Sequence, residues 1–273
     1  MKLRCADVEM LRQELEIQEP CACADPELSE SWFDNPLWAD KHRLLVEQAE
    51  NTGKVDLVLL GDSITERMNG RTHFPSQPQM PDNLEIFRSI LTRSGGGSMD
   101  ALALGVSGDT SPNLLWHLEN GMLPDSLNPK VWLILIGTND LGRTLCNKEA
   151  VLKGIRQVTR TLRARRPLAT LIVHGLLPRS DMSMAKPMED ENYKTGYYWE
   201  QIKWINEQLN QTCSTDVSID CLYMETVDIF LDHGGERIDK ETMTDGLHPS
   251  SKGYKQWLPL LSARVKQLLQ KSM

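Results

Sequence analysis

The sequence predicts an α/β protein: a three-layer α/β/α sandwich on a five-stranded parallel sheet with a flavodoxin-like strand arrangement. Three observations predict it. Short aliphatic runs recur along the chain, a turn rich in glycine and polar residues follows most of them, and helical patterns separate them. Strands that alternate with helices form right-handed βαβ units, whose parallel sheet is covered by helices on both faces.

The expected strands are five short apolar segments. Their aliphatic content is typical of strands that are buried on both faces. They are residues 55–60, 101–104, 131–136, 168–174 and 219–224.

Helical spacing accounts for the stretches between these strands. Residues 40–51 place Leu44, Leu45 and Ala49 on one side, which is the pattern of an amphipathic helix. The other expected helices are the stretch containing Leu114, Leu115 and Leu118, and residues 148–165, 199–213 and 251–270.

Two segments without periodicity interrupt the pattern, residues 69–81 and 179–196. Loops of this length in a compact domain are usually functional or mobile. The second carries several methionines and is close to Tyr197, so two interpretations stay open. The segment is either an apolar lid over an acyl chain or a surface loop, and the side chains concerned are Met182, Met184, Met188 and Tyr197.

Composition excludes several classes of protein. The chain is 40% hydrophobic and 25% charged, as soluble globular proteins are. Its net charge of −8 excludes the basic surplus of a nucleic-acid binder. No apolar run approaches the roughly 20 residues that cross a bilayer, so no integral membrane segment is expected. The histidines show no metal-ligand spacing, and His174, inside an apolar run, is expected to be a core residue.

The cysteines and the N-terminus bear on the compartment. Six scattered cysteines in a chain of this size are expected to be free thiols, with Cys213 and Cys221 the one pair to check. Charged residues run through the first 21 positions, which therefore lack the apolar core of a signal peptide. Without a signal core or a membrane segment, the sequence predicts a cytoplasmic protein, and free thiols would agree with that location.

The first polar signature, Gly61-Asp62-Ser63, follows the first expected strand. Reactive groups of an open parallel sheet collect where its strands end. A serine at this turn can point its hydroxyl into the crevice beside the N-terminus of the next helix. The alternative is structural, because Ser63 and Glu66 match a capping box in which the serine only caps the helix.

Two further turns could supply hydrogen-bond donors. Gly108 follows the second strand, where a glycine lets the backbone come close to a ligand and leaves its N–H free. Asn139 follows the third strand, and its amide could donate to a developing oxyanion. Taken alone, each residue is more typical of an ordinary turn.

Asp245 and His248 form the last signature, just before the C-terminal helix. Pro249 disfavours helical backbone at His248 and is itself well tolerated at a helix start. A local loop can therefore hold the carboxylate beside the imidazole, as a general base requires. The alternative is a solvated loop histidine.

Together these blocks resemble the four signature blocks of the SGNH (GDSL-type) hydrolase superfamily. Four segments are most similar to the platelet-activating-factor acetylhydrolase catalytic subunits and related esterases: Val58-Leu-Leu-Gly-Asp-Ser-Ile-Thr-Glu, Leu114-Leu-Trp-His-Leu-Glu-Asn-Gly, Pro129-Lys-Val and Leu176-Leu-Pro-Arg. The resemblance covers residues 32–273, which are expected to form one SGNH hydrolase domain. Residues 1–31 are left as an N-terminal extension.

The resemblance implies a role for each residue of the signature. Ser63 would attack an ester carbonyl, and its N–H, the N–H of Gly108 and the amide of Asn139 would hold the oxyanion. His248 would act as base and then acid, oriented by Asp245. The family needs no metal and no organic cofactor. The expected partner is a small-molecule, lipid or sugar ester with a short acyl group, acetyl above all, cleaved through an acyl-enzyme intermediate.

Other functions fit the same residues. A carbohydrate acetylesterase, a lysophospholipase or a thioesterase would share this machinery and differ in pocket shape. A catalytically silent binding module would keep the fold, although the intact set of signature residues counts against it. The oligomeric state is left open, a homo-oligomer included.

Overall fold

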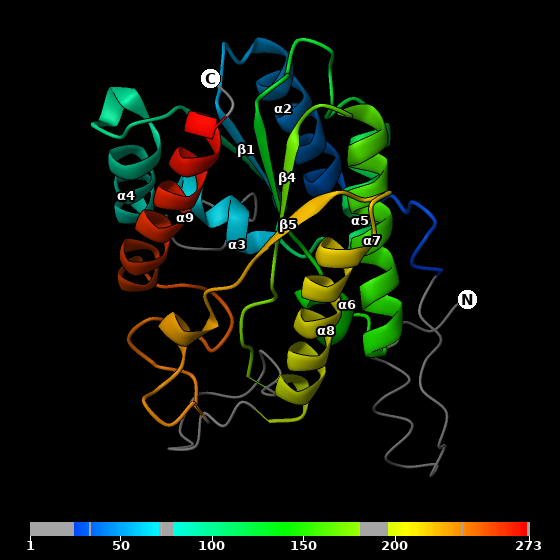
Figure 1. The fold of residues 1–273 in the computed structure, drawn as a ribbon, viewed down its shortest axis with the longest axis vertical. Coiled ribbons are helices and arrows are strands. Elements are labelled where there is room, and N and C mark those ends of the chain that lie inside the picture. The colour runs from blue at the N-terminus through cyan, green and yellow to red at the C-terminus, as the bar shows by residue number, and fades with distance from the viewer. Residues whose placement is uncertain are drawn as a thin grey trace.

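The computed structural model places five strands in one parallel sheet between two layers of helices (Figure 1). The strand order is β2-β1-β3-β4-β5, and every pairing is parallel. This is the flavodoxin-like order, so the predicted fold class is confirmed. The structure describes residues 25–32, 34–70, 72, 79–180, 196–235 and 237–271.

Each predicted strand is present, with its start shifted by up to two residues. Residues 168 and 169 precede β4, and Leu168 is fully exposed. Every residue of the two central strands, β1 and β3, is buried. The strands are β1 (Leu57–Gly61), β2 (Ala101–Gly105), β3 (Val131–Leu135), β4 (Thr170–His174) and β5 (Cys221–Met224).

The helices form two layers on opposite sides of the strands (Figure 1). One layer contains α4 (Pro81–Leu91) and α9 (Ser251–Lys271), which pack against each other. The other contains α5 (Ser111–Glu119), α7 (Lys148–Arg165) and α8 (Gly196–Thr215). The helix α2 (Pro36–Asn51) contacts α5, and the short elements are α3 (Ser63–Glu66), α6 (Thr138–Gly142), η1 (Arg67–Asn69), η2 (Arg93–Gly95) and η3 (Val227–Phe230).

The helix α4 is absent from the elements predicted from the sequence. Pro81 occupies the first turn of this helix, where a missing N–H costs nothing, and Ile86, Phe87 and Leu91 bury one face. That periodicity starts where the first predicted insertion ends. Most of the second insertion, with Met182, Met184 and Met188, lies outside the described residues, as does the side chain of Tyr197. The lid interpretation is therefore untested.

A glycine lets the start of α3 pack against β2. A Cβ at Gly105 would lie 2.5 Å from the carbonyl oxygen of Asp62 and 2.6 Å from the backbone nitrogen of Glu66. No side chain fits at those distances. The carboxyl end of β2 and the turn after β1 can therefore approach each other closely.

The segment before α2 is attached to the domain. The N–H of Glu30 donates to the carbonyl of Pro112, and the amide of Asn113 donates to the carbonyl of Glu30. Both contacts lie at the start of α5. The boundary between residues 31 and 32 stays a prediction.

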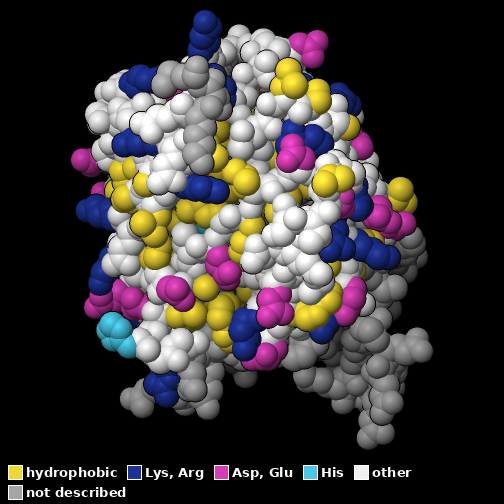
Figure 2. Space-filling view, viewed as in Figure 1, with side chains coloured by type: hydrophobic (Ala, Val, Ile, Leu, Met, Phe, Trp, Pro, Cys, Tyr) yellow, Lys and Arg dark blue, Asp and Glu magenta, His cyan; other side chains and the backbone are white. Residues whose placement is uncertain are grey.

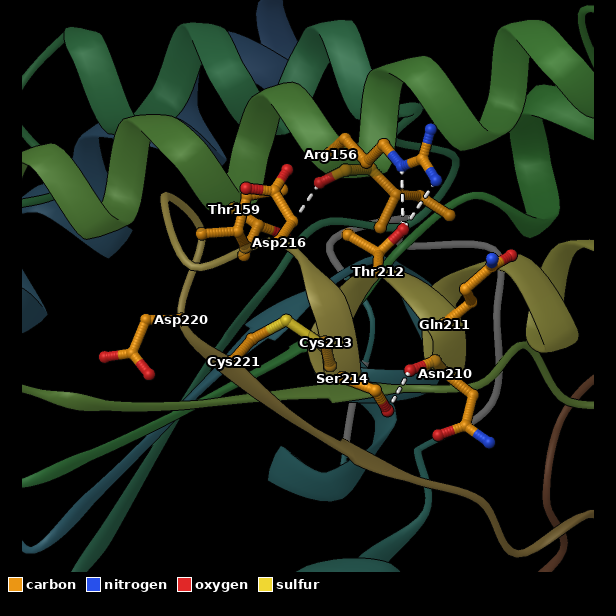
Figure 3. Close-up of a disulfide and its surroundings, with 12 residues drawn as sticks. Arg156, Thr159, Asn210, Gln211, Thr212, Cys213, Ser214, Asp216, Asp220 and Cys221 are labelled. Carbon is orange, nitrogen blue, oxygen red and sulfur yellow. Dashed lines mark hydrogen bonds between the residues drawn. A yellow bond between two sulfur atoms is a disulfide. The ribbon is translucent and has the colours of Figure 1, made fainter.

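The prediction of free thiols is wrong for the cysteines that the structure describes. Cys213 and Cys221 form a disulfide, and Cys146 is disulfide-bonded too. Figure 3 shows the first bond between the last turn of α8 and the start of β5. The tight connection between these elements brings the two Cα atoms to 4.7 Å, within disulfide range. Disulfides are typical of oxidising compartments, so the cysteines no longer support a cytoplasmic location, which stays a prediction.

The charges on the described surface agree with the acidic net charge of the sequence, which predicts no basic surplus. On the face drawn in Figure 2, Lys and Arg side chains alternate with Asp and Glu, without a continuous basic stripe among the described residues there. None of the helices in the described part of the chain combines the length and the apolar character needed to span a bilayer.

Removing the Cys213–Cys221 bond is expected to destabilise the fold without changing the site. The double variant Cys213→Ser/Cys221→Ser should lose about 2–3 kcal/mol of unfolding free energy, because a short loop is no longer closed in the unfolded chain. Urea unfolding measures the loss, and kcat should equal that of the parent. An unchanged free energy of unfolding would show that the bond contributes nothing.

Candidate active site

Three side chains from distant parts of the sequence meet at the carboxyl edge of the sheet. Ser63 is the first residue of α3, directly after β1, and His248 lies in the loop before α9. The hydroxyl Oγ of Ser63 is 2.9 Å from Nε2 of His248, and Nδ1 of His248 is 2.6 Å from Oδ2 of Asp245. The structure therefore brings the predicted serine, histidine and aspartate together in one hydrogen-bonded chain.

Ser63 does not cap α3. The cap is Asp62, whose Oδ1 accepts from the N–H of Ile64 at 2.9 Å. Glu66 points instead to the neighbouring strand end, where its carboxylate accepts from the backbone N–H and the hydroxyl of Ser107. The capping-box interpretation of Ser63 is therefore wrong, and its hydroxyl is directed to His248.

The loop around Asp245 is built to orient His248. Gly246 has a φ of 69°, which turns the chain back so that the N–H groups of Leu247 and His248 both donate to Oδ1 of Asp245. The other carboxylate oxygen, Oδ2, faces Nδ1 of the ring. Because a carboxylate only accepts, Nδ1 carries the hydrogen and Nε2 presents its lone pair to the Ser63 hydroxyl.

The environment changes the pKa of both partners. Burial lowers the pKa of His248, and the hydrogen bond from its ring to Asp245 partly opposes that shift. Burial raises the pKa of Asp245, but the hydrogen bonds and charge of His248 outweigh it, so the net shift is downward. The Asp245 side chain is 44% exposed, which limits the energy that the pair contributes to stability. The arrangement favours a neutral imidazole beside an ionised carboxylate.

Gly108 and Asn139 lie on the turns after the two strands that flank β1. Gly108 has a φ of 85°, a conformation that glycine adopts without strain, and no hydrogen bond among the described residues uses its N–H. The amide nitrogen of Asn139 donates to the carbonyl of Asp109 at 2.9 Å. An amide carries two hydrogens, so this bond leaves one for another acceptor. The cap of α6 is Gly137, not Asn139.

Buried carboxylates connect these turns to one another. Glu66 of α3 holds Ser107 and also pairs with Lys41 of α2 at 2.7 Å. Asp140 of α6 accepts from the N–H and the hydroxyl of Ser111, the first residue of α5. The pKa of Asp140 is raised to about 6. Burial is the main cause, and the hydrogen bonds from Ser111 act in the opposite direction. These contacts fix the turns after β1, β2 and β3 as one unit.

Two arginines near the site are absent from the residues predicted from the sequence. Arg67 is 3.4 Å from Oδ2 of Asp245, and its charge lowers the pKa of His248. Arg179 follows β4, donates to Thr138 beside Asn139, and lowers the pKa of His248 in the same way. The spacing of Arg67, one helical turn after Ser63, could have indicated its position. No local pattern indicates that of Arg179.

Other features do not add to this site. His174 is buried and satisfied by Gly175, Thr226 and Trp257, which confirms its prediction as a core residue. A cavity of about 530 Å³ opens at the opposite edge of the sheet, where Lys130 and Thr170 lie at the starts of β3 and β4. Among the described residues, no three His, Cys, Asp or Glu side chains are grouped to hold a metal ion.

Two solved structures with the same fold align with this chain over nearly all of their own length. A GDSL-like lipase from Bacteroides thetaiotaomicron has a TM-score of 0.59 and 18% identity, and it covers 86% of this chain and 99% of its own. Est24, a carbohydrate acetylesterase from Sinorhizobium meliloti, has a TM-score of 0.56 and 17% identity, with 79% and 100% covered. At these identities the similarity shows the fold alone.

Similarity in sequence identifies the family. The model of the GDSL-like lipase/acylhydrolase family matches residues 59–256, and the chain belongs to this family. Platelet-activating factor acetylhydrolase IB subunit alpha2 from Rattus norvegicus is 26% identical over 249 residues, which cover 91% of this chain and 92% of the relative. The matched range contains all five residues of the predicted site.

Removing the charge of Arg67 should move the pH dependence of the site. In Arg67→Gln the pKa of His248 should rise, because a neighbouring positive charge that opposes protonation is gone. The acid limb of an esterase pH profile should then shift to higher pH. Arg160→Gln is the matched control, because Arg160 forms an exposed pair with Asp216 far from the ring. A profile that does not move in Arg67→Gln contradicts the electrostatic account.

Proposed function

We propose that this chain is a serine ester hydrolase that cleaves short acyl esters, acetyl above all, through an acyl-enzyme intermediate. The observation that carries the proposal is the hydrogen-bonded chain from Ser63 through His248 to Asp245. A silent binding module of this fold would have no use for such a chain. The family supports the class of reaction, an acylhydrolase or esterase.

The proposed reaction uses each member of the chain in turn. Nε2 of His248 takes the proton of Ser63 as Oγ attacks the ester carbonyl, and Asp245 stabilises the imidazolium that forms. The same proton then passes to the leaving alcohol. Water repeats the sequence on the acyl-enzyme, with His248 again as base, and releases the acid and the free serine.

Three donors are proposed to stabilise the oxyanion. They are the N–H of Ser63 at the start of α3, the N–H of Gly108 and the second amide hydrogen of Asn139. The first two are backbone groups whose positions are fixed by the fold, so they need no reorganisation during the reaction. The bond from Asn139 to the carbonyl of Asp109 supports the third, because it fixes the amide plane.

Replacing Ser63 is the direct test of the activity. Ser63→Ala should abolish hydrolysis of p-nitrophenyl acetate and labelling by a fluorophosphonate probe, because Ser63 is the hydroxyl that Nε2 of His248 faces among the described residues. Its thermal unfolding should match that of the parent. Full activity in this variant would end the assignment.

Asn139→Ala should lower kcat by about 10²–10³-fold, the usual effect of removing one oxyanion donor, with a smaller change in KM. Asn51→Ala is the control, since the Asn51 side chain donates to its own helix, α2, away from the sheet edge. Steady-state kinetics on p-nitrophenyl acetate measures both variants. A loss confined to KM would argue that Asn139 only binds substrate.

The pH profile should show an acid limb set by His248. A base must be neutral, and burial lowers the pKa of this ring, so kcat/KM should be half-maximal below about pH 6.5, the value for an unperturbed histidine. Activity is lost as the pH falls through that point. A midpoint at or above about pH 7 contradicts the assignment.

The substrate class needs a panel of esters. Activity should be highest on acetyl esters and fall along a series of p-nitrophenyl esters with longer acyl chains. Acetylated sugars, lysophospholipids and acyl-thioesters test the rival activities, and the carbohydrate acetylesterase among the fold neighbours makes the sugars a necessary arm. A preference for long acyl chains would replace acetyl with a lipid substrate.

A further inference from the structure

A second cluster of titratable groups lies behind the proposed oxyanion donors. Asp109, the residue after Gly108, is fully buried, and its Oδ1 accepts from the indole N–H of Trp38 at 2.7 Å. Its Oδ2 is 3.0 Å from Nε2 of His117 on α5. Nδ1 of His117 is 2.8 Å from Nδ1 of His42 on α2. The proposed mechanism uses none of these groups.

The two histidines of this cluster share one hydrogen bond. Burial lowers the pKa of His42 to about 4, so this ring is neutral. Of the two facing Nδ1 atoms, one carries the hydrogen and the other accepts it.

The second nitrogen of His117 is fixed by Asp109. Nε2 and Oδ2 are within ion-pair distance, although their angle is outside that of a hydrogen bond. Asp109 and His117 therefore form a buried carboxylate–histidine pair. Arg143 faces the same carboxylate from the end of α6, and its interaction with Asp109 raises the Arg143 pKa against the larger effect of burial.

The backbone of Asp109 connects this pair to the proposed active site. Its carbonyl accepts the amide of Asn139, and the preceding residue is Gly108, whose own carbonyl accepts from Arg143 at 2.6 Å. A buried carboxylate without a cation beside it would move towards water or towards another partner. Such a movement would carry Gly108 and the acceptor of Asn139 with it.

We propose that the buried pair of Asp109 and His117, with His42 hydrogen-bonded to His117, is a positioning element that holds Gly108 and Asn139 in the geometry of an oxyanion site. The proposal rests on the proposed function. It makes Asp109 and His117 positioning residues, because neither touches the reacting atoms. His42 forms a hydrogen bond with Nδ1 of His117, and Trp38 donates to Oδ1 of Asp109.

The test is a double-mutant cycle. His117→Gln removes the ring that faces Oδ2 of Asp109 and should lower kcat by about 10–100-fold with little change in KM, the loss expected from a slight misplacement of the donors. Asp109→Asn removes the carboxylate that His117 faces and should lower kcat similarly. The double variant His117→Gln/Asp109→Asn is neutral and of similar shape, so it should recover kcat above either single variant.

A control and a second readout separate positioning from stability. His174→Gln replaces another buried histidine, one that contacts none of the proposed donors; it should lower the melting temperature and keep kcat. A trifluoromethyl ketone, which forms an oxyanion on the serine, should bind His117→Gln more weakly by the same factor as kcat/KM falls.

Three outcomes overturn the proposal. They are an unchanged kcat in His117→Gln, losses that simply multiply in the double variant, and ketone affinity equal to that of the parent. If one single variant fails to fold, the double variant and the ketone affinity of the other single variant still decide. Failure of the proposed function looks different, because the parent would then have no activity that depends on Ser63.

Discussion

The hydrogen bond between Ser63 and His248 is the interaction on which the rest of the site depends. It joins two residues that are 185 positions apart in the chain. The parallel sheet makes that closure feasible, because the ends of β1, β2 and β3 meet at one edge and the loop before α9 returns to it. The phenol of Tyr254 on α9 donates to the carbonyl of Ile64 on α3 at 2.6 Å, and this bond fixes the two sides at their point of contact.

Buried carboxylates hold the loops that surround this bond. Removing a carboxylate from water costs several kcal/mol unless hydrogen bonds or a cation replace the water. Glu66 is satisfied by Ser107 and Lys41, and Asp140 by Ser111. Each of these bonds crosses from one strand end to another element. These buried contacts of Glu66 and Asp140 therefore support the loops that carry the proposed donors.

The sheet and the main helices could be predicted because their signals are local. The aliphatic run of β3 and the amphipathic pattern of α7 can each be recognised from a short continuous stretch of sequence. The five proposed site residues could be predicted because strand ends and the last loop converge in this topology. Their roles as nucleophile, base and donors stay a proposal.

What could not be predicted depends on how the loops lie in the folded chain. The sequence offers Cys213 and Cys221 only as a pair to check, because their bond follows from the tight turn between α8 and β5. Arg179 reaches Thr138 from the end of another strand, and Asp109 meets His117 only when the loop before α5 packs against that helix. The capping-box alternative pairs Glu66 with Ser63, its nearest partner in the sequence. In the fold, Ser107 is the partner instead.

The most direct test of the central claim is the chemical identity of the intermediate. The protein is mixed with p-nitrophenyl acetate, quenched in acid within the first turnover and digested for mass spectrometry. The account predicts one acetyl group, on the peptide that contains Ser63 and on that residue, and no such adduct in His248→Ala. An acetyl group on another residue, or product release without any covalent adduct under conditions that trap one in a known serine esterase, would contradict it.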